Sequence, residues 1–307
     1  MNGDSKSRST VAVIGAGIQG VCISICLIKK GFKVTLFDRE DPGKESASYG
    51  NAGHFSPYAS VPINRPDILT DVPAMLLSSN GPLALKWNYV PKMFPWFLKF
   101  IKNCTKKKML HTAKYMHQIL DLSLPAYEEL FDEIDTEDLV VSNGIMYIWS
   151  NKNLPSRELE ISIREKLGVR QKLLNPKEIH DLEPNIKPIY DGGVFYSYAK
   201  HTNNPRRLLL KLFDLFLQKE GKFFKYQIQD INFDEEKPVL RTDSQRFVFD
   251  KIVIACGALS KKFTNDLFEN VPLDTERGYH VHFKDCENLI SRPVVYSNRG
   301  FGMTPME

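Results

Sequence analysis

The chain has 307 residues, of which 42% are hydrophobic and 25% are charged, and its formal net charge is +4. This length predicts about two domains with a sizeable core, and the composition excludes a disordered or fibrous protein. The net charge is too small to indicate nucleic-acid binding. The polar N-terminus lacks the apolar core of a signal peptide, so we expect a cytoplasmic protein.

The cysteines and histidines do not predict a metal site. The five cysteines show no CxxC spacing, which indicates reduced thiols rather than a disulfide framework. Cys22 and Cys26 lie on one expected helix, and His280 and His282 alternate along an expected strand. No further cysteine or carboxylate cluster completes either pair, so we expect no bound metal.

The first predicted element is a buried parallel strand, because residues 11–15 read VAVIG, an apolar run with β-branched side chains. A G-x-G-x-x-G triplet follows at Gly15, Gly17 and Gly20, then a helix pattern and a second strand, KVTLFD. The three glycines allow a tight turn, close approach of a pyrophosphate to the backbone, and close packing of helix on strand. The helix N-terminus adds free N–H groups and partial positive charge for phosphates.

Asp38 ends the second predicted strand. A carboxylate at this place accepts hydrogen bonds from both ribose hydroxyls of an adenosine and repels a 2′-phosphate, so the pattern disfavours NADP. The alternative is a glycine-rich turn in an α/β domain that binds no ligand. The motif by itself does not distinguish NAD from FAD.

Residues 45–62 are mostly small and polar and show no period, which is typical of a loop that offers backbone amides to a ligand. Further along, FPWFLKFIKNCTKKK places aromatic residues at helical spacing beside clustered lysines. Two interpretations stay open for this stretch. It is either a helix on the surface of a membrane with anionic lipid, or a helix of the domain whose lysines form its solvated end.

The middle of the chain predicts helices and a hairpin. Residues 113–134 repeat apolar side chains at helical spacing, and LVVSNGIMYIW predicts a hairpin that turns at Asn143-Gly144. Asn204 and Pro205 predict the N-cap and first position of a helix that runs to Gly221. The segments KYQIQDINF, PVLRTD and RFVFDKIVIACG then predict a meander that leads into a second ligand-facing turn.

Together, these motifs closely resemble those of the FAD-dependent amine and amino-acid oxidoreductases of the D-amino-acid oxidase superfamily. The likeness is greatest to the branch of the bacterial D-amino acid dehydrogenase small subunits. SYGNAGHFSP matches the S-x-x-N-A-G-x-x-S-P signature of that branch. The other matching stretches, which together extend from Val11 to the last residue, are DRE, GPLALKWNYVPKMFPWFLKFIKNC, KIVIACGALS and ERGYHVHF.

The resemblance implies an α/β fold with α+β character. We expect a Rossmann-like FAD-binding domain of the glutathione-reductase type, interleaved with a substrate domain built on a mixed sheet. The expected FAD-binding segments are residues 1–65 and 196–272, and the expected substrate-domain segments are residues 66–195 and 273–307.

The resemblance also implies which residues bind FAD. They are Ile14, Gly15, Ala16, Gly17, Ile18, Gln19, Gly20, Asp38, Arg39, Ser48, Asn51, Ala52, Gly53, Ala255, Cys256 and Gly257. Family members usually carry Ala or Gly where this chain has Cys256, which is therefore either a small packed side chain or a reactive thiol near the flavin.

Amino-acid oxidation by a flavin needs a cation for the substrate carboxylate, preferably the fork of an arginine. Arg277 and Tyr279 are our candidates for substrate contact, with His54 after the NAG sequence. Each also has a structural interpretation, such as an ion pair for Arg277 or a space-filling role for His54. Further candidates of the same residue types are Arg299, Tyr58 and Tyr296.

The expected function is FAD-dependent oxidation of the CH–NH bond of a D-amino acid or similar small amine, giving an imine that hydrolyses to a 2-oxo acid. The alternatives are a glycine- or sarcosine-type oxidase on the same fold, and an inactive dinucleotide-binding fragment. The expected partners are the amine substrate and an electron acceptor, either a quinone chain or oxygen, with peripheral contact to the inner membrane face as an option.

Members of the resembled family continue for about a hundred residues beyond the point that matches Glu307. That part supplies strands of the substrate sheet and a helix whose N-terminus faces the flavin pyrimidine carbonyls. We therefore expect this polypeptide, taken alone, to bind FAD poorly and to turn over little.

Overall fold

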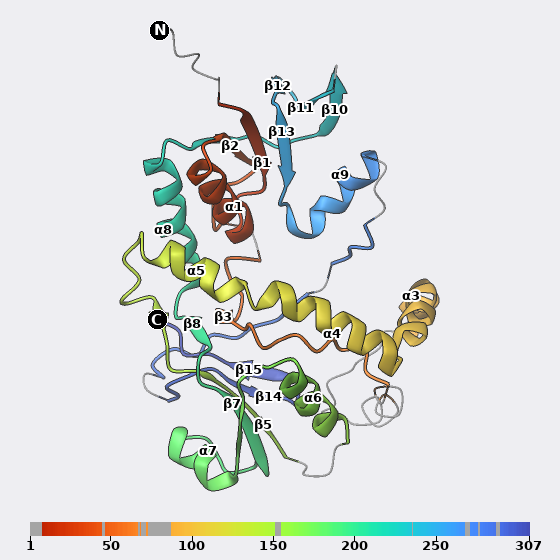
Figure 1. Ribbon diagram of the computed structural model, residues 1–307, viewed down its shortest axis with the longest axis vertical. Helices are drawn as coiled ribbons and strands as arrows, with labels where there is room; N and C mark the ends of the chain where they lie inside the picture. The colour runs from red at the N-terminus through yellow and green to blue at the C-terminus, as the bar shows by residue number, and fades with distance from the viewer. Residues whose placement is uncertain are drawn as a thin grey trace. The chain divides into compact units, whose positions relative to one another are not determined.

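The computed structural model describes residues 8–44, 47–66, 68, 72, 87–150, 155–234, 236–267, 271–275, 277–286 and 289–307. The chain divides into two compact units, which we treat separately (Figure 1). Unit 1 comprises residues 1–51, 130–139 and 204–283, and unit 2 comprises residues 52–129, 140–203 and 284–307. The start of the tryptophan-rich stretch, residues 81–86, and Glu276 of ERGYHVHF lie outside the described residues.

Unit 1 is built on a parallel sheet with the strand order β13-β1-β2-β9. Its two central strands, β1 and β2, bury continuous apolar runs, as the pattern VAVIG predicts for a parallel sheet covered on both faces. From β1 the chain continues to β2 on one side, whereas β13 pairs on the other. The bounds are β1 (Thr10–Ile14), β2 (Lys33–Asp38), β9 (Lys222–Lys225) and β13 (Lys251–Ile254).

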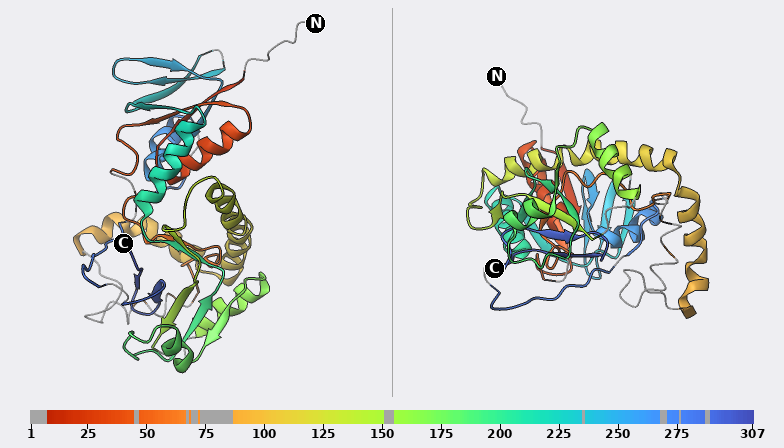
Figure 2. Two further views of the ribbon diagram at one scale, coloured as in Figure 1. Left: turned by 90° about the vertical axis from the view of Figure 1, so that its left-hand side faces the viewer. Right: turned by 90° about the horizontal axis from the view of Figure 1, so that it is seen from below.

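One face of this sheet is covered by helices α1 (Ile18–Lys29) and α8 (Pro205–Gln218), which contact each other (Figures 1 and 2). Helix α8 begins as predicted, because the Asn204 side chain accepts a hydrogen bond from the Arg207 N–H and Pro205 follows it. The helix ends at Gln218, slightly before the predicted Gly221. Its buried stripe consists of Leu208, Leu209, Leu212, Leu215 and Phe216.

The other face packs on an antiparallel meander, β10-β11-β12. Ile231 and Leu240 of the meander join Ala12, Ile14 and Phe37 of the sheet in one buried cluster. The predicted meander is confirmed, and β13 then returns the chain to the parallel sheet. The bounds are β10 (Asp230–Asp234), β11 (Lys237–Arg241) and β12 (Arg246–Val248), with η2 (Gly257–Leu259) and α9 (Ser260–Asp266) following β13.

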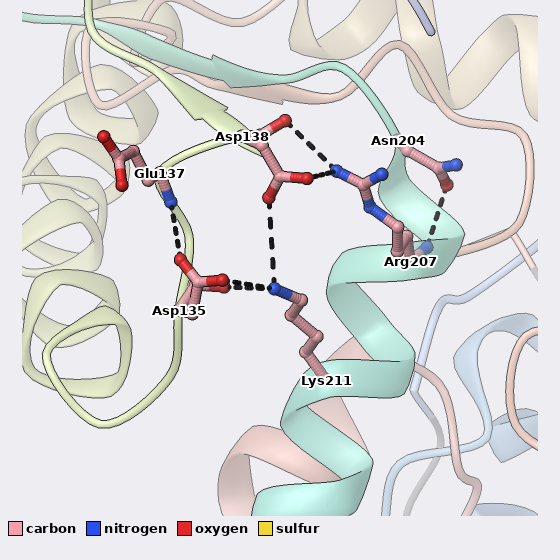
Figure 3. Close-up of polar contacts among 6 residues, drawn as sticks. All are labelled: Asp135, Glu137, Asp138, Asn204, Arg207 and Lys211. Carbon is pink, nitrogen blue, oxygen red and sulfur yellow. Dashed lines mark hydrogen bonds and ion pairs between the residues drawn. The ribbon is translucent and has the colours of Figure 1, made fainter.

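A short stretch, residues 130–139, joins unit 1 through apolar ends and ion pairs. Leu130, Phe131 and Leu139 are buried. Between them, the Asp138 carboxylate pairs with the Arg207 guanidinium at 2.6 Å (Figure 3). The acids of this stretch pair with basic residues of α1, of α8 and of the α8 C-cap. These further pairs are Asp135–Lys211, Glu133–Lys29 and Glu133–Lys219.

Unit 2 contains a mixed sheet with the order β15-β14-β5-β7-β6 and a small antiparallel sheet with the order β3-β8-β4. Tyr58 and Tyr196 are buried and stacked, with ring centroids 3.7 Å apart. The bounds are β3 (His54–Phe55), β4 (Val140–Val141), β5 (Ile145–Trp149), β6 (Lys172–Leu174), β7 (Gly192–Tyr196), β8 (Lys200–Thr202), β14 (Val294–Tyr296) and β15 (Phe301–Met303).

The helical elements of unit 2 include a break that the sequence pattern did not predict. The single helix expected over residues 113–134 is two helices that meet around Asp121 and Leu122. No helix in the described ranges is both long and apolar enough to cross a bilayer. The bounds are η1 (Trp87–Tyr89), α3 (Val90–Asn103), α4 (Lys106–Leu120), α5 (Ser123–Phe131), α6 (Pro155–Lys166) and α7 (Pro176–Leu182).

Two predicted elements are wrong. Strands β4 and β5 flank Asn143-Gly144 but belong to different sheets, so this stretch is not a hairpin. The Asn143 side chain instead donates to the Ser291 carbonyl at 2.6 Å, a long-range bond that no local turn signal encodes. The strand expected around His280 and His282 is also absent from the described residues 277–283, which are irregular and exposed.

Candidate functional site

The glycine turn that follows β1, residues 15–20, lies at the point in the sheet where the chain leads to β2 on one side of β1 while β13 pairs on the other. Strand β1 pairs with β2 on one side and β13 on the other, with Ile14 opposite Ile254. The turns that follow β1 and β13 therefore lie side by side at the carboxyl ends of their strands, and the Ala255 N–H donates to the Ile14 carbonyl at 2.7 Å. In open α/β sheets, ligands bind in the crevice outside such a switch point.

The glycines of the turn are required by close approach of the backbone. A Cβ atom on Gly20 would lie 1.8 Å from the Gly15 carbonyl oxygen, and one on Gly15 would lie 2.4 Å from the Ala255 carbonyl oxygen. Gly15 also has a φ of +109°, which L-residues rarely adopt. At Gly17 the nearest atom to a Cβ would be the Ser48 Oγ, at 3.3 Å.

Asp38 lies directly at this turn. Its Oδ2 accepts from the Ala16 N–H at 2.7 Å, and its Oδ1 accepts from the Glu40 N–H at 3.1 Å. An ionised carboxylate offers about four lone-pair sites, so two sites remain for ribose hydroxyls. The neighbouring Arg39 is exposed.

The N-terminus of α1 suits an anion. Its first turn contains no acidic residue, and the Ser48 hydroxyl accepts from the Ile18 N–H at 3.0 Å. Asn51 steadies the same loop, because its side-chain amide donates to the Ala47 carbonyl at 3.3 Å. Free N–H groups and the helix dipole make such a terminus a binding site for a pyrophosphate.

Cys256 packs beside the turn as a protonated thiol. Its Sγ lies 3.1 Å from the Ile14 carbonyl oxygen and donates to it. Burial, reinforced by the negative charge of Asp38, raises the pKa of the thiol to about 12. A thiol with this pKa is not a nucleophile at neutral pH, which favours the interpretation of Cys256 as a small packed side chain.

These observations fit the ADP half of FAD. The residues that would hold it lie within unit 1: the turn from Ile14 to Gly20 and the N-terminus of α1 for the pyrophosphate, Asp38 for the ribose, and the turn from Ala255 to Gly257 beside them. Asp38 and Ser48 already accept from the Ala16 and Ile18 N–H groups, so the pyrophosphate would be held by the other N–H groups at the start of α1.

The candidates for substrate contact are placed in different units. Arg277 and Tyr279 lie in the irregular stretch of unit 1 and are exposed, Tyr279 by 90%. His54 lies in β3 of unit 2 and is half-buried. The other tyrosine candidates are engaged in the core: the Tyr296 hydroxyl donates to the Ile189 carbonyl, and the Ser56 hydroxyl donates to the Tyr58 hydroxyl oxygen.

The surroundings of His54 fix its protonation. The Thr304 hydroxyl donates to the Ala52 carbonyl at 3.1 Å, so the His54 Nε2, 2.9 Å from the same hydroxyl oxygen, must carry a proton and donate. The Nδ1 of His54 is then an acceptor. Burial lowers the pKa of His54 to about 4, so the ring is neutral at pH 7.

His201 was not among the residues predicted from the sequence, and it lies opposite His54 in the β3–β8 pair. His201 is 1% exposed, and burial lowers its pKa to about 4. Within the part of the chain that the structure describes, its Nδ1 has no hydrogen-bond partner. The only signal in the sequence was a histidine just before an N-cap, and nothing local pairs it with His54.

Comparisons with known proteins show the family. The family model described as FAD dependent oxidoreductase (DAO) matches residues 10–307. The chain belongs to the DAO family of FAD-dependent oxidoreductases. The expected α/β fold is thereby confirmed, and FAD is the cofactor of the family.

Two relatives of the chain are named as enzymes that act on D-amino acids. A D-amino-acid oxidase of Bradyrhizobium diazoefficiens is 33% identical over 280 residues, which are 90% of this chain and 66% of that protein. A D-amino acid dehydrogenase of Helicobacter pylori is 26% identical over 310 residues, or 97% of this chain and 72% of that protein. The chain thus spans about two thirds of the length of these relatives.

Among solved structures, a glycine oxidase of Bacillus cereus superposes with a TM-score of 0.62 at 17% identity. The match covers 98% of this chain and 69% of that one. At this identity the likeness supports the fold alone.

Proposed function

We propose that this chain provides the FAD- and substrate-binding residues of an enzyme that oxidises the CH–NH bond of a D-amino acid or similar small amine. The observation that carries the proposal is the Asp38 carboxylate at the glycine turn of a parallel-sheet switch point, in a chain of the DAO family. The two relatives named for D-amino acids support the substrate class.

When bound, FAD supplies the hydride acceptor for the CH–NH bond, and the resulting imine hydrolyses to a 2-oxo acid. The protein's part is binding, orientation and electrostatics. Asp38 accepts the ribose hydroxyls, and the N–H groups of the turn hold the pyrophosphate. The residues Ile14–Gly20, Arg39, Ser48, Asn51–Gly53 and Ala255–Gly257 complete the proposed cofactor set.

On the substrate side, we assign the carboxylate to Arg277, whose planar fork matches it with two hydrogen bonds, and a further hydrogen bond to the Tyr279 hydroxyl. His54, in unit 2, stays a separate candidate for substrate contact, and its ring is neutral at pH 7. We also propose the domain boundaries expected from the sequence. Residues 1–65 and 196–272 form the FAD-binding domain, and residues 66–195 and 273–307 form the substrate domain.

The test is a visible spectrum of residues 1–307 saturated with FAD and mixed without oxygen with single amines. Because this polypeptide alone is expected to turn over little, the proposal predicts slow bleaching of the flavin absorbance by D-alanine and none by L-alanine. Bleaching by glycine or sarcosine alone would instead indicate the glycine- or sarcosine-type oxidase. FAD binding without bleaching by any amine would contradict catalysis and leave a dinucleotide-binding chain.

The electron acceptor is proposed as a quinone or oxygen, with the protein in the cytoplasm and, for a quinone, in peripheral contact with the inner membrane face. Oxygen consumption measured against reduction of a quinone analogue separates the two. An oxidase consumes oxygen with substrate alone, whereas a dehydrogenase requires the analogue.

A further inference from the structure

Helix α3 of unit 2 carries a row of apolar side chains that are exposed to solvent. Phe94, Leu98 and Ile101 follow one another at about one helical turn, and their exposed fractions are 56%, 53% and 48%. Trp96 is 46% exposed and stacks on Phe100. A different face packs inward, through Met93, Phe97, Phe100 and the buried Cys104.

The same region is basic and lacks any acid. Residues 87–120 contain no Asp or Glu, and their positive charge exceeds the net +4 of the whole chain. On α3 the lysines lie on the side opposite the packed face, next to the exposed apolar stripe. The lysines of this stretch are Lys92, Lys99, Lys102, Lys106, Lys107, Lys108 and Lys114.

The start of α4 concentrates this charge. Lys106, Lys107 and Lys108 occupy its first turn, where the helix dipole already leaves partial positive charge. Helices α3 and α4 meet at this point, so the three lysines lie beside the C-terminal end of α3 (Figures 1 and 2). Like charges at this end raise each other's energy, and an external anion would relieve the repulsion.

A cavity of about 600 Å³ opens at the same corner. Its lining residues include Lys107, Lys108 and His111 of α4, with Asn64 and Asn103 beside them. Part of this wall is fixed, because the Asn64 amide donates to the Asn103 carbonyl at 2.8 Å and the Lys108 ammonium donates to the Lys102 carbonyl at 3.0 Å. Lys107 in the same lining adds a further ammonium donor, which suits a headgroup phosphate.

We propose that the α3–α4 corner, residues 87–114, is a docking surface for a membrane that contains anionic lipid. The exposed stripe of Phe94, Leu98 and Ile101 enters the boundary between headgroups and acyl chains, as the apolar face of an interfacial helix does. The lysines stay in the headgroup layer and attract anionic lipid. The cavity takes one headgroup phosphate.

The exposed apolar stripe and the clustered lysines together favour a membrane over a protein partner. A second copy of the chain would bring the same lysines opposite themselves, and like charges disfavour that contact. An acidic protein would complement the lysines, but lipid also accepts the apolar stripe. The surface lies within unit 2 and does not depend on the redox chemistry proposed above.

The experiment is vesicle co-sedimentation of residues 1–307, with phosphatidylcholine vesicles that either contain or lack phosphatidylglycerol. We expect binding to the anionic vesicles, at least about tenfold weaker binding without phosphatidylglycerol, and release as ionic strength rises from about 0.1 M to about 1 M.

Two variants and matched controls locate the surface. Lys102→Glu/Lys106→Glu/Lys107→Glu should weaken binding at least about tenfold, because each lysine near an anionic surface contributes about a factor of five. The control Lys166→Glu/Lys177→Glu/Lys187→Glu makes the same charge change at exposed sites of unit 2 and should bind much more tightly than the first variant. Leu98→Ser/Ile101→Ser should weaken binding, whereas Leu173→Ser, at an exposed site of β6, should not.

Equal affinity of the two triple variants, equal binding to both kinds of vesicle, or no binding to anionic vesicles would overturn the proposal. A wild-type dimer that Leu98→Ser/Ile101→Ser dissociates, with no vesicle binding, would show that the stripe is a self-interface and would also overturn it. None of these measurements uses FAD or an amine, so they are independent of the test of the redox activity.

Discussion

The Asp38 carboxylate accepts a hydrogen bond from the Ala16 N–H, with Oδ2 and N 2.7 Å apart. This bond ties the end of β2 to the turn between β1 and α1. A ribose held by Asp38 and a pyrophosphate held by the turn would therefore bind to one connected piece of backbone. The same carboxylate thus shapes the turn and, in our proposal, would also face the adenosine.

The first prediction concerns Gly20. Gly20→Ala would place a Cβ atom 1.8 Å from the Gly15 carbonyl oxygen, so the helix and turn must separate. We expect a loss of about 2–3 kcal/mol in the free energy of unfolding, measured by denaturant titration, and weaker FAD binding. Gly278→Ala is the control, since no atom lies within 4 Å of its Cβ. Equal stability of the two variants would contradict the close packing of the turn.

The second prediction concerns the start of α8. Asn204→Ala removes the side-chain oxygen that accepts from the Arg207 N–H at 2.8 Å. We expect a loss of about 1 kcal/mol in unfolding free energy, and a smaller loss for Asn204→Ser, which keeps a capping oxygen. Chemical denaturation of the three proteins measures this. If serine and alanine destabilise equally, the cap does not contribute as described.

The third prediction concerns Cys256. Because its pKa is about 12, its thiol should react with iodoacetamide at pH 8 much more slowly than the exposed Cys26 and Cys286. Mass spectrometry of peptides over a time course gives the order of labelling. Labelling of Cys256 first would show a reactive thiol beside the cofactor turn.

Much of unit 1 could be predicted from the sequence because its signals are local. The strand VAVIG, the glycine triplet, Asp38 and the Asn204-Pro205 cap each specify backbone conformation within a few residues, and the structure has the predicted strands and helix starts.

Unit 2 was harder to predict because its decisive contacts join distant residues. Asn143-Gly144 has the local chemistry of a hairpin turn, yet the Asn143 amide bonds to Ser291 and the flanking strands enter different sheets. His54 was a candidate from its place after the NAG sequence. Its partner Thr304 lies near the other end of the chain, and no local pattern links the two.

The fourth prediction follows from the buried histidines of unit 2. Burial lowers the pKa of His54 and of His201 from 6.5 to about 4. As pH falls below 6.5, the unfolded histidines take up protons and the folded ones do not. The stabilisation is therefore complete above about pH 6.5 and is lost progressively down to about pH 4.

Thermal melts across this pH range test the assignment. His201→Leu should remove part of the loss of stability at low pH, reducing proton uptake on unfolding by about one. His180→Gln, at an exposed site of α7, should leave the pH dependence unchanged. The same pH dependence in wild type and His201→Leu would mean that His201 does not remain neutral in the folded chain.

The most direct test of the central claim is a calorimetric titration of residues 1–307 with FAD and with FMN, which lacks the ADP half. We predict that FAD binds more tightly than FMN, and that Asp38→Asn weakens FAD at least about tenfold while leaving FMN unchanged, because a charged acceptor for the ribose hydroxyls is lost. Equal affinity for FAD and FMN, or an unchanged affinity of Asp38→Asn for FAD, would contradict it.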